Sequence, residues 1–84
     1  MPLNFNNFLE KGKNVPISID YFGKTISGGL YLSAWSESSA AFAVTYNKFY
    51  HGYLIYRGGI WEAEKITDLG LVEVLGRLVE EFYQ

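Results

Sequence analysis

Residues 53–64, "YLIYRGGIWEAE", decide the fold of this chain. The pair Gly58-Gly59 separates two runs that are rich in aromatic and branched side chains, which is a strong signal for a hairpin with a two-residue turn. Because Glu62 and Glu64 avoid a hydrophobic core, their side of the hairpin is expected to face outward. The turn pairs Arg57 with Ile60, Tyr56 with Trp61, Ile55 with Glu62, Leu54 with Ala63 and Tyr53 with Glu64. The side chains expected to point inward are Leu54, Tyr56, Trp61 and Ala63.

Another hairpin is predicted in residues 17–35, "ISIDYFGKTISGGLYLSAW". Its apolar and polar residues alternate, and Gly23-Lys24 fits a two-residue turn that has glycine first. This turn places Tyr21 opposite Ile26. The residues expected on the inward face are Ile17, Ile19, Tyr21, Ile26, Leu30, Leu32 and Ala34. The residues expected on the outward face are Ser18, Asp20, Phe22, Thr25, Ser27, Tyr31, Ser33 and Trp35.

Residues 41–46, "AFAVTY", predict a further strand between the two hairpins, ending at Asn47-Lys48. A plain two-residue turn at that point would direct Phe42 to the outward face, which conflicts with the burial that this side chain needs. An odd loop or a β-bulge removes the conflict, and Gly52 suits the left-handed backbone that a bulge requires. We therefore expect a kink in the sheet beside His51.

Helical patterns lie at both ends of the chain. Residues 4–12, "NFNNFLEKG", predict a short helix, and residues 67–83 predict a longer amphipathic helix that Thr67 or Asp68 caps. Short connections between successive strands favour antiparallel neighbours. The predicted fold is therefore one α+β domain over residues 1–84, with two layers. It contains a short N-terminal helix, a five-stranded antiparallel meander sheet and a C-terminal amphipathic helix, with both helices on one sheet face.

Composition narrows the class of protein. The chain is 49% hydrophobic and 19% charged, with a net charge of −2, which indicates a globular domain. It has no cysteine, so a disulfide framework and thiolate metal sites are excluded. Its apolar runs are far shorter than the ~20 residues of a membrane helix, and we expect a soluble, cytoplasmic protein. Without a dense Lys/Arg cluster, we expect neither nucleic acid nor membrane as a partner.

No pattern of catalytic residues emerges. His51, the one histidine, is the natural candidate for proton transfer near neutral pH, but a histidine beside a kink is more often solvated or bonded to a tyrosine. Glu62 and Glu64 lack the spacing of metal ligands, and the Gly-Gly pairs lack the lysine of a phosphate-binding loop. We expect no enzyme, no cofactor and no metal site, while a binding contact at His51 remains open.

One surface is left uncovered if both helices lie on the inward face. The opposite face carries aromatic and branched residues among polar ones, as contact surfaces do, although scattered exposed aromatics are also tolerated in sheets. The interface candidates are Phe22, Tyr31, Trp35, Tyr53, Ile55 and Ile60. The expected function is a protein-protein interaction domain that self-associates through this face as a homo-oligomer. The alternative is a small-molecule-binding domain with an aromatic pocket between sheet and helix.

Overall fold

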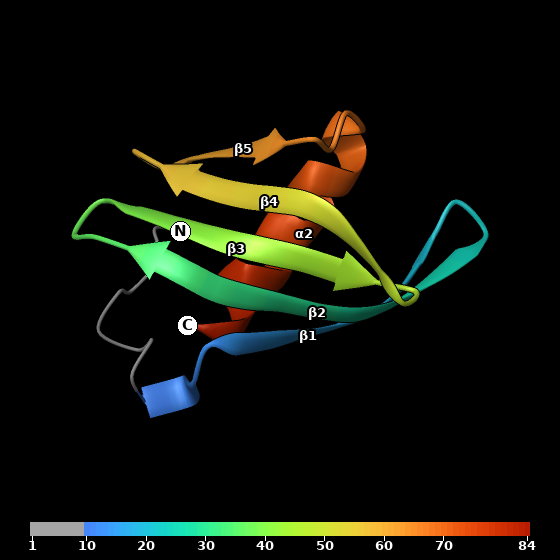
Figure 1. Ribbon diagram of the computed structural model, residues 1–84, viewed down its shortest axis with the longest axis horizontal. Coiled ribbons are helices and arrows are strands. Elements are labelled where there is room, and N and C mark those ends of the chain that lie inside the picture. The colour runs from blue at the N-terminus through green and yellow to red at the C-terminus, as the bar shows by residue number, and fades with distance from the viewer. Residues whose placement is uncertain (1–9) are drawn as a thin grey trace.

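A computed structural model describes residues 10–84 as an antiparallel sheet with a helix packed on one side (Figure 1). The five strands follow one another in the sheet in chain order. They are β1 (Asn14–Tyr21), β2 (Lys24–Trp35), β3 (Ser39–Tyr46), β4 (Phe49–Arg57) and β5 (Ile60–Glu64), and they precede helix α2 (Leu69–Phe82). The α+β meander and the C-terminal helix are as predicted. Most of the helix expected over residues 4–12 lies outside the described residues, and within them Glu10 and Lys11 are helical.

The core fills the space between the sheet and α2. Its most deeply buried side chains, all at most 2% exposed, come from four strands, the helix and its C-cap: Val15, Ile17, Leu30, Leu32, Ala40, Phe42, Val44, Leu54, Leu75, Val79 and Tyr83. Tyr83, directly after α2, donates a hydrogen bond of 2.7 Å from its hydroxyl to the Gly12 carbonyl and so joins the two ends of the described chain. Burial of these large side chains is the main stabilising contribution to a small domain.

The hairpin of β1 and β2 turns one position earlier than expected. Phe22 and Gly23, both with positive φ (49° and 78°), form the turn, so Tyr21 pairs with Lys24 instead of Ile26. This register differs from the predicted one by two residues, which preserves the face of every strand residue. It also sets Val15, only 1% exposed, opposite Leu30.

Of the two predicted alternatives, an odd loop or a bulge beside Gly52, the structure contains the bulge. Val44 pairs with Gly52 and Thr45 with Tyr50, so His51 is the extra residue in β4. The bulge brings Phe42 opposite Leu54 in the core. Gly52 has a φ of 124°, and a Cβ atom there would collide with the Glu64 carbonyl oxygen. The turn before the bulge is Asn47-Lys48, as expected, and the turn after it, Gly58-Gly59, gives all five predicted pairs.

A further bulge between Leu32 and Ala34 was not predicted. Leu32 pairs with Phe42, but Ala34 pairs with Ala41 and Trp35 with Ala40. Ala40 is 2% exposed and belongs to the core. Because directly paired residues share a face, Trp35 lies on the helix side of the sheet and Ala34 on the opposite side. The predicted faces of these two residues are therefore wrong, because an inserted residue inverts the alternation beyond it.

Helix α2 begins at the expected cap and approaches β5 closely. The Asp68 side chain accepts a hydrogen bond of 3.2 Å from the Leu71 backbone N–H. At Gly76 a Cβ atom would come within 2.7 Å of the Trp61 ring, so only glycine fits at the present distance. Trp61 also donates a hydrogen bond of 2.6 Å from its indole N–H to the Glu80 carboxylate. Trp61 thus links the hairpin that decides the fold to the helix.

The bulge at Gly52 gives a first test. Gly52→Ala should lower the free energy of unfolding by about 3 kcal/mol, because backbone strain and a collision with β5 add together. Gly58→Ala is the matched control, since its φ of 60° is also positive but nothing lies within 4 Å of the added carbon. We expect it to cost about 1 kcal/mol. Equal losses in urea unfolding would contradict the close approach of Gly52 to β5.

The contact between Gly76 and Trp61 gives another test. Gly→Ala in an open helical position stabilises by about 1 kcal/mol, whereas here the methyl group overpacks against the indole ring and should destabilise by a similar amount. In a Trp61→Val background the collision is removed, and Gly76→Ala should then raise the midpoint of urea unfolding. The same sign in both backgrounds would show that the indole ring does not limit the approach of the helix.

Candidate functional site

Two surfaces of the domain are candidates for a functional site, and one is the outer face of the sheet. Figure 1 shows α2 on one side of the five strands, and within residues 10–84 no helix lies on the other side. The centre of this outer face consists of two neighbouring rows of paired residues. One row is Tyr31, Ala43 and Tyr53, and the other is Ala34, Ala41 and Ile55. We call these six residues the outer patch.

The outer patch combines projecting and small side chains. Tyr31 is 48% exposed and lies across the short Ala43 from Tyr53. A shallow hollow of about 340 Å³ adjoins the patch, and its lining includes Ala34, Ala41 and Ile55. The rim is polar: Arg57 and Glu62 approach to 3.8 Å. An apolar centre with a polar rim is the usual anatomy of a protein contact surface.

The predicted interface residues do not all gather at this patch. Tyr31, Tyr53 and Ile55 belong to it, and Ile60, 64% exposed, lies on the same face at the start of β5. Two others lie elsewhere. Phe22 is in the β1–β2 turn at 89% exposure, and Trp35 is on the helix side, where the Lys13 ammonium lies 4.9 Å from its ring centre. The sequence did not point to Ala34, Ala41 or Ala43, because a small residue can be recognised as part of a hollow only when its cross-strand neighbours are known.

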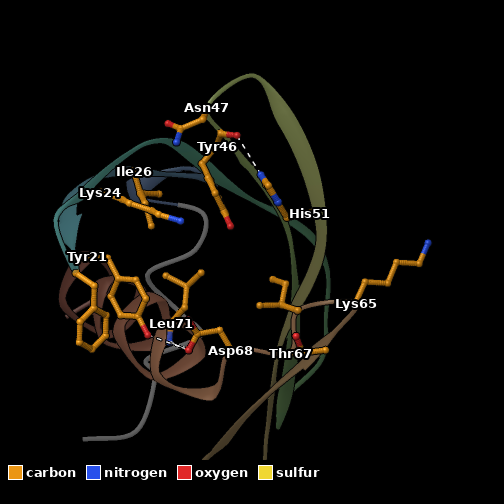
Figure 2. Close-up of a pocket in the computed structure, with 12 residues that line it drawn as sticks. Tyr21, Lys24, Ile26, Tyr46, Asn47, His51, Lys65, Thr67, Asp68 and Leu71 are labelled. Atoms are coloured by element: carbon orange, nitrogen blue, oxygen red, sulfur yellow. Dashed lines mark hydrogen bonds between the residues drawn. The ribbon is translucent and has the colours of Figure 1, made fainter.

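The other candidate is a pocket of about 560 Å³, drawn in Figure 2. It lies at the end of the sheet opposite the turn between β4 and β5 (Figure 1). It opens between the β1–β2 turn, the β3–β4 hairpin and the start of α2. Its floor includes Ile26 and Leu71, each 5% exposed. The volume is within the ~300–1,000 Å³ of small-molecule sites. An aromatic pocket between sheet and helix was the alternative prediction, and the sequence did not indicate which residues would form it.

A stacked pair of rings forms one wall of the pocket. Tyr46 and His51 lie parallel, with ring centres 3.6 Å apart and planes 8° apart. The His51 Nε2 atom lies 3.2 Å from the Tyr46 carbonyl oxygen. A carbonyl oxygen only accepts, so this nitrogen carries the proton and donates it to the hydrogen bond. His51 is half-buried, and the stack and this hydrogen bond hold its ring against Tyr46. The prediction left open a solvated or a tyrosine-bonded histidine, and in the structure it is bonded to a tyrosine through the backbone carbonyl.

The opposite wall links the β1–β2 hairpin to the start of α2. The Tyr21 hydroxyl donates a hydrogen bond of 2.8 Å to Asp68, the N-cap of α2, as Figure 2 shows. This bond, followed by the one from the Leu71 N–H, lowers the pKa of the Asp68 carboxyl, because both donors favour the charged form. Burial and the nearby carboxylate raise the pKa of the Tyr21 hydroxyl. Asp68 is thus an ionised group at one side of the pocket.

Nowhere in residues 10–84 do three His, Cys, Asp or Glu side chains converge as metal ligands would. Within residues 10–84, no helix is both long enough and apolar enough to cross a bilayer. No protein-family model, curated protein or solved structure matches the chain.

The cap at Asp68 predicts a pH effect. A carboxyl whose pKa is lower in the folded state stabilises the protein above its unfolded pKa of about 3.9, and this stabilisation is lost as the pH falls through the folded value. The thermal midpoint of the wild type should therefore fall from about pH 5 downward more steeply than that of Asp68→Asn, whose side chain still caps the helix. In Tyr21→Phe, NMR titration should show the Asp68 pKa closer to its ordinary value. An unchanged value would contradict the role of the tyrosine.

Proposed function

We propose that this domain is a protein-protein interaction module that acts by binding, and that it self-associates through the outer patch. The observation that carries the proposal is the pair of neighbouring rows Tyr31–Ala43–Tyr53 and Ala34–Ala41–Ile55 on a face that α2 leaves open. Tyrosine is enriched at interfaces because it offers a large apolar body, a polar tip and few rotatable bonds. Alanine between tyrosines leaves room for a side chain of a partner.

A second copy of the chain suits this patch because it contains both projections and hollows. In a two-fold symmetric interface each copy presents the same surface, so tyrosines of one copy can enter the alanine hollow of the other. Sheets that pack face to face lie about 10 Å apart, with their side chains interdigitated. Arg57 and Glu62 at the rim are placed to form polar contacts around such a centre.

Sedimentation or light scattering over a dilution series tests self-association. The wild type should show a mass that rises with concentration towards that of a dimer. Tyr53→Lys should weaken the dimer at least tenfold, because the lysine would be desolvated at the interface centre. In the monomer the same lysine faces Glu64 across the strands, so the fold should be preserved.

Ser18→Lys is the matched control. Ser18 is exposed on the same face, but it lies in the edge strand β1, away from the patch, and the charge change is the same. Its dissociation constant should equal that of the wild type. A wild-type chain that remains monomeric at millimolar concentration, or an equal loss in both variants, would contradict self-association through the outer patch.

A further inference from the structure

The pocket of Figure 2 has an apolar floor, aromatic walls and a small set of polar groups, which together define the kind of molecule it would accept. Tyr21 and Phe22 meet edge to face, with centres 4.7 Å apart, on one side, and the Tyr46–His51 stack lies on the other. A flat apolar body between such walls would contact ring faces and edges on both sides. The floor residues exclude water beneath it.

Two donors at one side of the pocket have no bonding partner within residues 10–84. Tyr21 and Lys24 are paired across the turn, so the Lys24 side chain shares the face of the sheet on which the pocket lies. Figure 2 shows Lys24 and the Tyr46 hydroxyl directed into the same part of the pocket, whereas Lys65 points away. Among residues 10–84, neither the Lys24 ammonium nor the Tyr46 hydroxyl has an ion-pair or hydrogen-bond partner. Both are available to a ligand.

Two other polar groups of the lining, Asn47 and Asp68, are already bonded, and Asp68 carries a charge opposite to that of Lys24. The Asn47 side chain accepts from the Ser27 N–H and donates to the Thr25 carbonyl, so its amide holds the hairpin to β2. Figure 2 shows Asp68 on the far side of the pocket from Tyr46, beside Leu71. A negative group on a ligand would therefore avoid the Asp68 side and occupy the side of Lys24.

We propose that this pocket binds a small molecule with a flat apolar body and one carboxylate. The body lies over Ile26 and Leu71 between the aromatic walls, and the carboxylate accepts from the Lys24 ammonium and the Tyr46 hydroxyl. The ionised Asp68 disfavours a second negative charge on the ligand. This site is separate from the outer patch, so a negative result for one proposal does not contradict the other.

Three probes that share one indole ring test the charge preference: indole-3-acetate, the neutral indole-3-ethanol and the cationic tryptamine. Titration followed by amide ¹H–¹⁵N NMR should give the tightest binding for indole-3-acetate, with a dissociation constant of about 0.1–1 mM, as small fragments reach. Indole-3-ethanol should bind about tenfold more weakly, because it lacks the charge-assisted bond. Shifts should map to residues around Ile26, Tyr46 and Leu71.

Lys24→Gln and Tyr46→Phe should each reduce the preference for indole-3-acetate over indole-3-ethanol, and Tyr46→Phe keeps the ring that stacks on His51. The matched controls are Lys48→Gln and Tyr50→Phe, whose side chains do not line the pocket. Both should retain the wild-type preference. Absence of shifts at the pocket with all three probes at 5 mM, or tightest binding of tryptamine, would overturn the proposal. So would an unchanged preference in Lys24→Gln.

Discussion

The bulge formed by His51 and Gly52 is the constraint on which both candidate surfaces depend. A regular pairing after the Asn47-Lys48 turn would put Phe42 opposite Tyr53, with the phenyl ring of Phe42 in solvent. One extra residue in β4 restores the match, so Phe42 pairs with Leu54 in the core. Only glycine tolerates this geometry, because its φ is 124° and its Cα lies against the Glu64 carbonyl.

The same extra residue distributes side chains to the two surfaces. Beyond the bulge, Tyr53 and Ile55 face outward, where they join three alanines and Tyr31 in the outer patch. At the bulge itself, His51 turns to the helix side and stacks on Tyr46, and this stack forms a wall of the pocket. A single irregularity in one strand therefore affects both candidate binding surfaces, which face different directions.

Helix α2 determines which face of the sheet is covered. Trp61 is half-buried between the sheet and α2, under Gly76, and bonded to Glu80. At the beginning of the helix, Asp68 joins the N-terminus of α2 to Tyr21 of β1. These contacts hold one face of the sheet closed. They leave the opposite face with apolar side chains that the described residues do not cover, and this difference between the faces is the physical basis of the interaction proposal.

The sequence by itself determined what depends on neighbouring residues along the chain. The Gly58-Gly59 turn fixed five cross-strand pairs, and Thr67 or Asp68 marked the start of α2. The conflict between parity and burial at Phe42 required an odd loop or a bulge near Gly52. Only the tertiary structure decided the register of β1 and the bulge before Ala34. A shift of two residues leaves every β1 side chain on the same face, so the alternation of apolar and polar residues could not distinguish the two registers, and the bulge pairs Trp35 with the buried Ala40 of another strand. Those two features moved Phe22 into a turn and Trp35 to the helix side, away from the outer patch. The outer patch and the pocket also depend on packing between elements. Ala43 forms a hollow only because Tyr31 and Tyr53 lie on either side of it, and Lys24 lines a pocket only because other elements pack beside it.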